Sequence, residues 1–226
     1  MDRDDMKHAA AEAAIGHVKP GTIVGVGTGS TADFFIVALA ARPKLVAAAV
    51  ASSDASATAL RVAGISVVGL DEALPLPLYV DGADEVDPGL RLIKGAGGAL
   101  AREKVVASAA ALFVCIVDES KLVERLGDGA DAAPVPVAVL PMAAAYVAER
   151  LRALGGRPAV RPDYLSDDGA VILDVAGLDL SDPERLEEAL GAIPGVVECG
   201  IFAHRRADVV LVGTAAGVRT LRRPGG

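Results

Sequence analysis

Residues 79–104 combine acids, a lysine and a glycine-rich turn at the point where an apolar strand ends and a helix begins. The acids include Asp81 and Asp84, the lysine is Lys94, and Glu103 follows the turn. A chain that only had to fold would not need so many charges where strand ends meet helix starts. Open α/β sheets bind their ligands at the carboxyl ends of strands, so this segment is the first candidate for a site.

Asp81 and Asp84 flank Gly82 and Ala83 directly after a buried strand. Two carboxylates at this spacing can converge on one small ligand, where they would bind hydroxyl groups, exchange protons or hold a metal. An Asx-type turn is the structural alternative. The motif has no histidine and no third fixed acid, which makes a metal the weakest interpretation. We therefore expect a substrate site and no metal site.

Lys94 precedes a turn that contains Gly95, Ala96 and Gly97. The lysine could neutralise a developing oxyanion, and backbone amides of the turn could help. Glu103, in the helix that follows, could be a general base if burial offsets the helix dipole, which otherwise keeps its pKa low. The alternative is an exposed first-turn glutamate paired with the next lysine. Because Lys94 and the preceding aspartates lie nearby in the sequence, we favour the catalytic interpretation of Glu103.

A second glycine-rich turn, at residues 24–31, joins the first strand to a helix. Backbone amides near Thr28 and Gly29 can converge there, and Ser30 and Thr31 can cap the helix, whose N-terminus favours an anion. The turn is neither a dinucleotide fingerprint, because Ser30 stands where the third glycine belongs, nor a P-loop, because the Gly-Lys-Ser/Thr ending is missing. It predicts a phosphate cradle, with a plain strand-helix turn as the alternative.

Two further polar groups follow buried strands. Residues 52–56 contain three serines, which either donate hydroxyls to the same ligand or cap a helix. Lys121 follows the strand expected at 112–117 and would add a positive charge at the same edge of the sheet, although an isolated lysine is more often solvated.

The order of elements predicts an α/β fold with a Rossmann-like parallel sheet. Short continuous apolar runs between helices are typical of a parallel sheet covered on both faces. We expect strands at 22–26, 45–50, 65–68, 78–80 and 112–117, and helices at 4–18, 31–41 and 52–63.

Past residue 127 the composition changes, and we expect a linker at 128–134. The element order that follows, β-α-β-β-α-β, predicts a smaller α+β ferredoxin-like domain. Its strands are expected at 135–139, 158–161, 170–175 and 196–199, and its helices at 142–154 and 183–190. An apolar strand at 208–213 is a candidate to rejoin the first sheet. We therefore assign residues 1–130 and 205–226 to the catalytic domain and 131–204 to the second domain.

The bulk composition excludes several classes of function. A net charge of -8 argues against nucleic acid as a partner, since phosphate neutralisation needs clustered Lys and Arg. The two cysteines, Cys115 and Cys199, are far apart, which suits a reducing cytoplasm and gives no zinc signature. The N-terminus lacks the apolar region of a signal peptide, and no apolar run approaches the roughly 20 residues of a bilayer-spanning helix. We expect a cytoplasmic protein without a membrane partner.

A phosphate cradle, hydroxyl-binding aspartates, a lysine and a carboxylate base at one sheet edge suit proton abstraction beside the carbonyl of a phosphorylated polyol. Moving a carbonyl from C1 to C2 of a sugar needs a base that shuttles a proton between the two carbons. It also needs an electrophile that holds the enediolate charge. We expect no redox cofactor and no metal for such a reaction.

With these motifs the sequence resembles the type A ribose-5-phosphate isomerases over almost its whole length. The resemblance implies interconversion of ribose 5-phosphate and ribulose 5-phosphate in the non-oxidative pentose phosphate pathway, without a cofactor, by a homodimer or homotetramer. The motifs that carry it are Gly27-Thr-Gly-Ser-Thr31, Asp81-Gly-Ala-Asp-Glu85, Lys94-Gly-Ala-Gly-Gly-Ala-Leu100 with Arg102-Glu-Lys104, and Asp118-x-Ser-Lys121.

The same resemblance implies that Glu103 is the proton acceptor and that Lys94 stabilises the enediolate. Asp81 would assist ring opening, and Asp84 would bind sugar hydroxyls. The implied substrate pocket is lined by Thr28, Gly29, Ser30, Thr31, Asp81, Gly82, Ala83, Asp84, Lys94, Gly95, Ala96, Gly97 and Lys121, with Lys7 as a further phosphate partner.

Three departures from the family pattern concern the surroundings of these residues. Ala96 replaces a glycine of the lysine turn, where a methyl group could narrow the pocket or restrict φ. Pro136 replaces a glutamate and removes a backbone donor, so we expect an edge strand there. The turn at 166–170 lacks the family's usual asparagines.

Two other classes of function compete with the isomerase. A non-catalytic sugar-phosphate sensor would keep the cradle without a base and lysine pair, and it would want a helix-turn-helix that the acidic N-terminus does not offer. A nucleotide-dependent oxidoreductase would place an acid at the end of the second strand, close to Asp54, but the third glycine of its fingerprint is absent.

Overall fold

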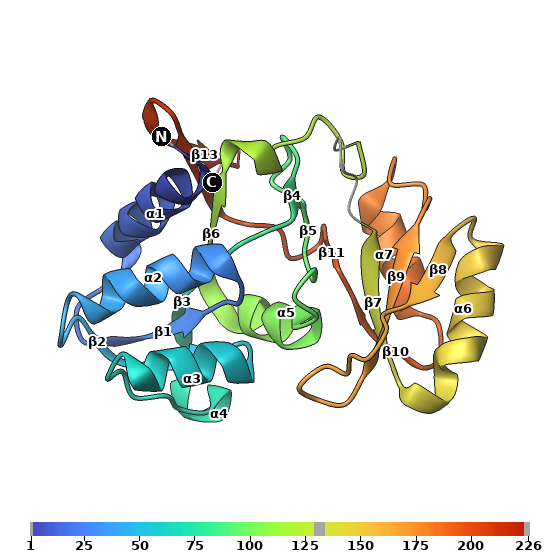
Figure 1. Cartoon of the computed structure of the whole chain (residues 1–226), viewed down its shortest axis with the longest axis horizontal. Helices are drawn as coiled ribbons and strands as arrows, with labels where there is room; N and C mark the ends of the chain where they lie inside the picture. The colour runs from blue at the N-terminus through green and yellow to red at the C-terminus, as the bar shows by residue number, and fades with distance from the viewer. Residues whose placement is uncertain (1, 129–133, 224–226) are drawn as a thin grey trace. The chain divides into compact units, whose positions relative to one another are not determined.

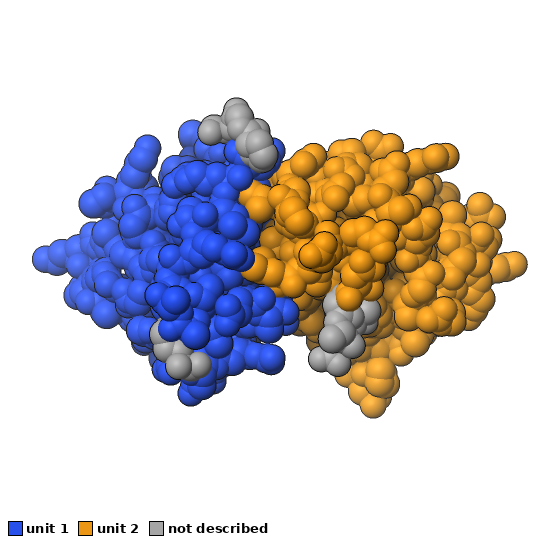
Figure 2. Space-filling model, turned by 90° about the horizontal axis from the view of Figure 1, so that it is seen from above, with its two compact units in different colours: residues 1–83, 102–121, 207–226 blue, residues 84–101, 122–206 orange. Residues whose placement is uncertain are grey.

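The computed structural model describes residues 2–128 and 134–223 (Figure 1). The chain divides into two compact units (Figure 2): residues 1–83, 102–121 and 207–226 form the first, and residues 84–101 and 122–206 form the second. Residues 84–101 thus pack with the second unit, and the domain limits given above stay a prediction. Most of the expected linker, residues 129–133, lies outside the described residues.

The first unit contains a six-stranded sheet of order β13-β12-β6-β3-β1-β2, in which β13 is antiparallel to β12 and the other pairs are parallel. This confirms the predicted α/β class and the return of the last apolar strand to the first sheet. The strands are β1 (Thr22–Val26), β2 (Val46–Ala51), β3 (Leu76–Asp81), β6 (Ala110–Asp118), β12 (Val209–Thr214) and β13 (Gly217–Arg222).

Helices cover this sheet with small and branched apolar side chains. Helix α1 begins with a capping box between Asp2 and Asp5 and packs on α2, β6 and β12. Gly213 of β12 makes this approach possible, because a Cβ there would lie 1.9 Å from the carbonyl oxygen of Met6. The helices of this part of the chain are α1 (Arg3–Ala14), α2 (Ser30–Ala40), α3 (Asp54–Val62), α4 (Leu70–Ala73) and α5 (Leu100–Ala109), with a 3-10 turn, η1, at Ile15–His17.

The second unit contains an antiparallel sheet of order β10-β7-β9-β8 with helices α6 and α7, the arrangement expected of a ferredoxin-like domain. Its elements are β7 (Val135–Val139), η3 (Pro141–Ala143), α6 (Ala144–Ala153), β8 (Arg157–Val160), β9 (Val171–Ala176), α7 (Pro183–Gly191) and β10 (Val196–Cys199). A small sheet of order β11-β5-β4 joins β4 (Glu85–Val86), β5 (Leu92–Ile93) and β11 (Ile201–Phe202).

The prediction that Pro136 marks an edge strand is wrong, because β7 lies between β10 and β9. The carbonyl oxygen of Pro136 accepts a hydrogen bond from the amide of Gly200 at 2.7 Å. In an antiparallel strand the nitrogen of a residue points to the same side as its oxygen, so the missing donor also faces Gly200. A Cβ at Gly200 would lie 2.7 Å from Cδ of Pro136, so glycine leaves the room that the proline ring occupies.

The predicted set of strands is also incomplete, and it contains one strand that the structure lacks. The strand expected at 65–68 is reduced to a single parallel bridge between Ala49 and Val67. Strand β13 was not predicted, because its residues are mostly exposed and show no apolar face.

In the described part of the chain, no helix is long and apolar enough to cross a membrane.

Gly213→Ala should lower the free energy of unfolding by about 1–3 kcal/mol, because the new methyl group pushes the backbone of α1 away from β12. Gly191→Ala is the matched control. Nothing lies within 4 Å of a Cβ at that position, and alanine favours the end of α7. Urea unfolding of both variants tests the claim, and equal stability of Gly213→Ala and the wild type would contradict the packing described here.

Candidate active site

The turn between β1 and α2 is held in place by the carboxylate of Asp81 at the end of β3. Its Oδ1 accepts hydrogen bonds from the amides of Thr28 (3.1 Å) and Gly82 (2.7 Å). A Cβ at Gly27 would lie 1.8 Å from the same oxygen, so only glycine fits there. Gly29 has φ of 99° and directly precedes α2. The predicted cradle and the predicted aspartate therefore form one structure.

The second oxygen of Asp81 accepts a hydrogen bond from the hydroxyl group of Tyr79. Both side chains are fully buried. Burial raises the pKa of Tyr79 well above its ordinary value, and the negative charges of Asp81 and Glu103 raise it further. Tyr79 therefore stays protonated and donates its hydrogen bond to Asp81.

The serines at 52–56 support the cradle. Ser53 is the N-cap of α3, and its hydroxyl accepts from the amide of Ser56. The Ser56 hydroxyl donates to the carbonyl oxygen of Gly27 at 2.6 Å. Thr28 Oγ1 lies 3.0 Å from Ser52 Oγ and 3.3 Å from Ser56 Oγ. Of the two interpretations left open by the sequence, the structure favours capping and support of the turn.

Lys7, Arg102 and Glu103 are further charged residues of the first unit that concern the cradle and its surroundings. Lys7 of α1 donates to Ser30 Oγ at 3.1 Å and pairs with Asp4, which places the predicted phosphate partner beside the cradle. Glu103 lies on α5 and is 3% exposed. Its neighbour Arg102 pairs with Asp54 at the start of α3 at 2.8 Å, which ties α5 to the helix that begins beside the cradle.

Lys121 lies in a 3-10 turn, η2 (Glu119–Lys121), directly after β6. Asp118 closes that strand: its Oδ1 accepts from the amide of Ser120 at 3.0 Å and from the Ser120 hydroxyl. Strand β6 pairs with β3 in parallel, with Asp81 opposite Cys115. The predicted Lys121 thus follows the strand next to the one that carries Asp81, at the carboxyl end of the sheet.

Lys94 and Asp84 belong to the second unit. Lys94 is 3% exposed, its amide donates to the carbonyl oxygen of Gly200, and its Nζ lies 5.6 Å from the centre of the Phe202 ring. Asp84 Oδ2 accepts a hydrogen bond from the amide of Ala96 at 3.0 Å. The acid predicted to bind hydroxyl groups therefore also holds the turn that follows the lysine.

The structure brings the predicted residues together in two groups. The first unit contains Thr28, Gly29, Ser30, Thr31, Asp81, Gly82, Ala83, Glu103, Lys7 and Lys121. The second contains Asp84, Lys94, Gly95, Ala96 and Gly97. The chain passes between the units directly after Ala83 and directly before Arg102. The predicted pairing of Glu103 with Lys94 on one substrate stays a prediction.

Tyr79 is a site residue that the sequence reasoning missed. It stands two positions before Asp81, and alternate side chains of a strand point to the same face, so the spacing could have predicted their contact.

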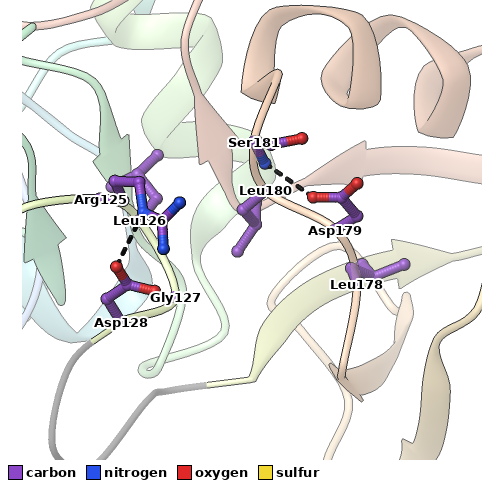
Figure 3. A pocket seen from close by; sticks show the side chains of 8 residues that line it. All are labelled: Arg125, Leu126, Gly127, Asp128, Leu178, Asp179, Leu180 and Ser181. Carbon is purple, nitrogen blue, oxygen red and sulfur yellow. Dashed lines mark hydrogen bonds and ion pairs between the residues drawn. The ribbon is translucent and has the colours of Figure 1, made fainter.

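A hollow of about 190 Å³ in the second unit is lined by residues 125–128 and 178–181 (Figure 3). None of the predicted site residues lines it. Among the described residues, no group of three or more His, Cys, Asp or Glu could hold a metal ion.

The first unit defines an α/β protein with an ordered glycine turn and buried acids, and the second unit contains a buried lysine. Residues 48–217 match the family model described as ribose 5-phosphate isomerase A (phosphoriboisomerase A). The chain is 55% identical over 218 residues to a ribose-5-phosphate isomerase A of Acidithiobacillus ferrooxidans, covering 96% of this chain and 98% of that one. It is 51% identical over 229 residues to one of Bordetella bronchiseptica, covering all of both chains.

Solved structures agree. A ribose 5-phosphate isomerase A from Neisseria gonorrhoeae superposes with a TM-score of 0.95 at 43% identity, covering 99% of this chain and 98% of that one. A D-ribose-5-phosphate isomerase in complex with phospho-erythronic acid gives a TM-score of 0.93 at 36% identity, covering 99% and 100%. The chain belongs to the ribose 5-phosphate isomerase A family.

Tyr79→Phe should lower the free energy of unfolding by about 1–3 kcal/mol, because it removes one donor from the buried carboxylate of Asp81. Tyr146→Phe is the control, since Tyr146 is 49% exposed. Unfolding at neutral pH measures the difference, and equal losses in both variants would contradict the role of Tyr79.

The same pair of proteins tests the pKa of Tyr79. The pKa in the folded state lies above the ordinary value of 10.0, so the contribution of Tyr79 is fully present below that value and is lost as the pH rises above it. The stability difference between the wild type and Tyr79→Phe should therefore shrink above pH 10. A constant difference up to pH 11 would show that Tyr79 has the same pKa in the folded and unfolded chains.

Proposed function

We propose that this chain interconverts ribose 5-phosphate and ribulose 5-phosphate through an enediolate, as part of the pentose phosphate pathway. The observation that supports this most is the match to ribose-5-phosphate isomerase A sequences over the full chain at 51% identity. The ordered turn at residues 27–31, the buried Glu103 and the buried Lys94 supply the groups that the reaction needs. The reaction moves a proton and a carbonyl and changes no net oxidation state.

Glu103 is the proton acceptor. Its carboxylate takes the proton from C2 of the open-chain aldose and returns it to C1, while a second proton moves from the C2 oxygen to the C1 oxygen. Glu103 is 3% exposed, so its side chain is shielded from bulk water. Shielding from water also protects the enediolate from side reactions.

Lys94 stabilises the negative charge that develops on the oxygen of the enediolate. Its ammonium group is buried beside the Phe202 ring, where charge interactions are less screened than in water. Backbone amides of the turn at Gly95 and Gly97 bind the same part of the substrate, while the amide of Ala96 donates to Asp84. Asp84 binds sugar hydroxyls from the base of that turn.

The phosphate group binds at the start of α2, to the amides of Gly29, Ser30 and Thr31 and to the hydroxyls of Thr28, Ser30 and Thr31, since the amide of Thr28 donates to Asp81. Lys7 donates to Ser30 already and supplies one positive charge, and Lys121 supplies another. A helix N-terminus with converging amides is a favourable site for phosphate.

Asp81 accepts hydrogen bonds from Tyr79, Thr28 and Gly82. This supports a role in fixing the cradle and the surroundings of Glu103, and a contribution to ring opening is proposed in addition. Gly82 and Ala83 provide the turn that leads from Asp81 to Asp84.

We also propose that the protein is a homodimer or homotetramer in the cytoplasm.

Glu103→Gln should reduce turnover of ribose 5-phosphate by about 10²–10⁴-fold, because the amide cannot accept the proton from C2. Binding of ribose 5-phosphate should change little, since the amide keeps the size and polarity of the side chain. Ketose formation and calorimetric binding measure the two effects. Glu149→Gln, an exposed position on α6, is the control. Full turnover by Glu103→Gln would exclude Glu103 as the base.

Lys94→Met should lower kcat by about 10²–10³-fold, the typical loss on removing one preorganised donor to an oxyanion. Methionine fills most of the space of the lysine side chain but carries no charge. A change in KM alone, with kcat unchanged, would mean that Lys94 binds the substrate without stabilising the enediolate.

A further inference from the structure

Two side chains of the second unit hold consecutive carbonyl groups of the turn that follows Lys94. Arg161 Nη1 donates to the carbonyl oxygen of Ala96 at 3.0 Å, and Nη2 donates to that of Gly95 at 3.3 Å. The Tyr164 hydroxyl donates to the carbonyl oxygen of Gly97 at 2.9 Å. Three successive peptide groups are thus fixed by residues that lie about 65 positions later in the chain.

Arg161 is itself held rigidly by the sheet. Its Nε and Nη2 donate to the two carboxylate oxygens of Asp174 at 2.9 and 2.6 Å, a bidentate ion pair. Asp174 lies on β9, a central strand that pairs with β7 and β8. The side chains of Arg161 and Asp174 are 17% and 24% exposed. The turn is therefore connected through one guanidinium group to the middle of the ferredoxin-like sheet.

Tyr164 adds a steric contact to its hydrogen bond. A Cβ at Gly98 would lie 2.2 Å from the Tyr164 hydroxyl oxygen, and Gly98 has φ of +77°. Glycine at this position lets the tyrosine ring lie directly on the turn. The ring also lies 5.4 Å from the guanidinium carbon of Arg161, within the range of a cation–π interaction.

The turn is held from its other side by Asp84, which accepts from the amide of Ala96 at 3.0 Å. The carbonyl and the N–H of a trans peptide point in opposite directions, so the grip on the Ala96 carbonyl directs the Gly97 N–H away from Arg161. Asp84, Ala96, Arg161 and Asp174 all line one hollow of about 290 Å³. Asp84 accepts from the N–H of the Gly95–Ala96 peptide group, and Arg161 donates to the carbonyl oxygen of the same group.

We propose that Arg161 and Tyr164 are positioning residues for the isomerase reaction: they fix the turn at residues 94–98 so that the Lys94 ammonium and the turn amides meet the enediolate. This inference rests on the role proposed for Lys94. Arg161 acts through the turn and does not touch the substrate. We expect the loss of Arg161 to lower kcat more than substrate binding, because small displacements of a group that stabilises the transition state cost far more in rate than in binding.

Arg161→Lys and Tyr164→Phe test the proposal. Lysine keeps the charge at 161 but cannot bond Asp174 and two carbonyls at once, so kcat should fall by about 10–100-fold with KM changed less than about threefold. Tyr164→Phe keeps the ring on Gly98 and removes one hydrogen bond, so kcat should fall by a smaller factor, about 3–10-fold. If Arg161→Lys does not fold, Tyr164→Phe alone decides the question.

Arg206→Lys is the matched control, because Arg206 also pairs with a carboxylate, that of Glu184, and also donates to a carbonyl group, that of Gly89. It should keep the wild-type kcat. Wild-type turnover in the same assay tests the isomerase activity separately, so failure of the positioning role and failure of the proposed function are distinguishable.

A double-mutant cycle separates positioning from general stability. In a Lys94→Met background, Arg161→Lys should cause little further loss of kcat, because the group that the turn positions is already gone. The same fold-loss in both backgrounds would overturn the proposal, as would wild-type kcat in both Arg161→Lys and Tyr164→Phe.

Discussion

The carboxylate of Asp81 is the constraint on which the first unit's site depends. It ends a buried strand, where an ionised group without partners would be very costly. It is stabilised by the hydroxyl group of Tyr79 and by the amides of Thr28 and Gly82, and these same bonds fix the turn before α2. Folding of the strand therefore also orders the cradle, and the ligand does not have to organise it.

In the second unit an acid also fixes the backbone beside it. Asp84 and Arg161 hold the Gly95–Ala96 peptide group of the lysine turn from opposite sides, and Asp174 orients the arginine. In both units an acid that sequence reasoning assigns to the substrate also shapes the backbone around it. Positioning by ion pairs and hydrogen bonds is what proton transfer between adjacent carbons requires, because the base and the electrophile must both be in place before the reaction begins.

Much of the fold could be predicted from the sequence, because buried strands are visible in it as short apolar runs. Strands β1 and β7 have the predicted limits, and the return of 208–213 to the first sheet is confirmed by the pairing of β12 with β6. Strand β13 could not be predicted, since its exposed residues carry no apolar signal. The place of Pro136 in an interior strand depends on Gly200, a neighbour that only the folded chain supplies.

The sequence predicts the residue types of the candidate site, but most of the side chains that hold those residues in place cannot be predicted from it. Tyr79 could have been found from its spacing to Asp81, whereas Arg161 and Tyr164 could not, because their contacts with the lysine turn join segments far apart in the sequence. Local patterns show which groups are available for chemistry. They do not show which side chains of another segment hold those groups.

A crystal structure with a four-carbon sugar-acid phosphate bound tests the account most directly, since such a ligand has the charge of the enediolate. The account predicts its phosphate at residues 28–31, with the Glu103 carboxylate beside the carbon chain and the Lys94 ammonium within hydrogen-bond distance of the acid group. A ligand bound elsewhere, or a bound ligand that meets Glu103 while Lys94 lies on the far side of the protein, would contradict it.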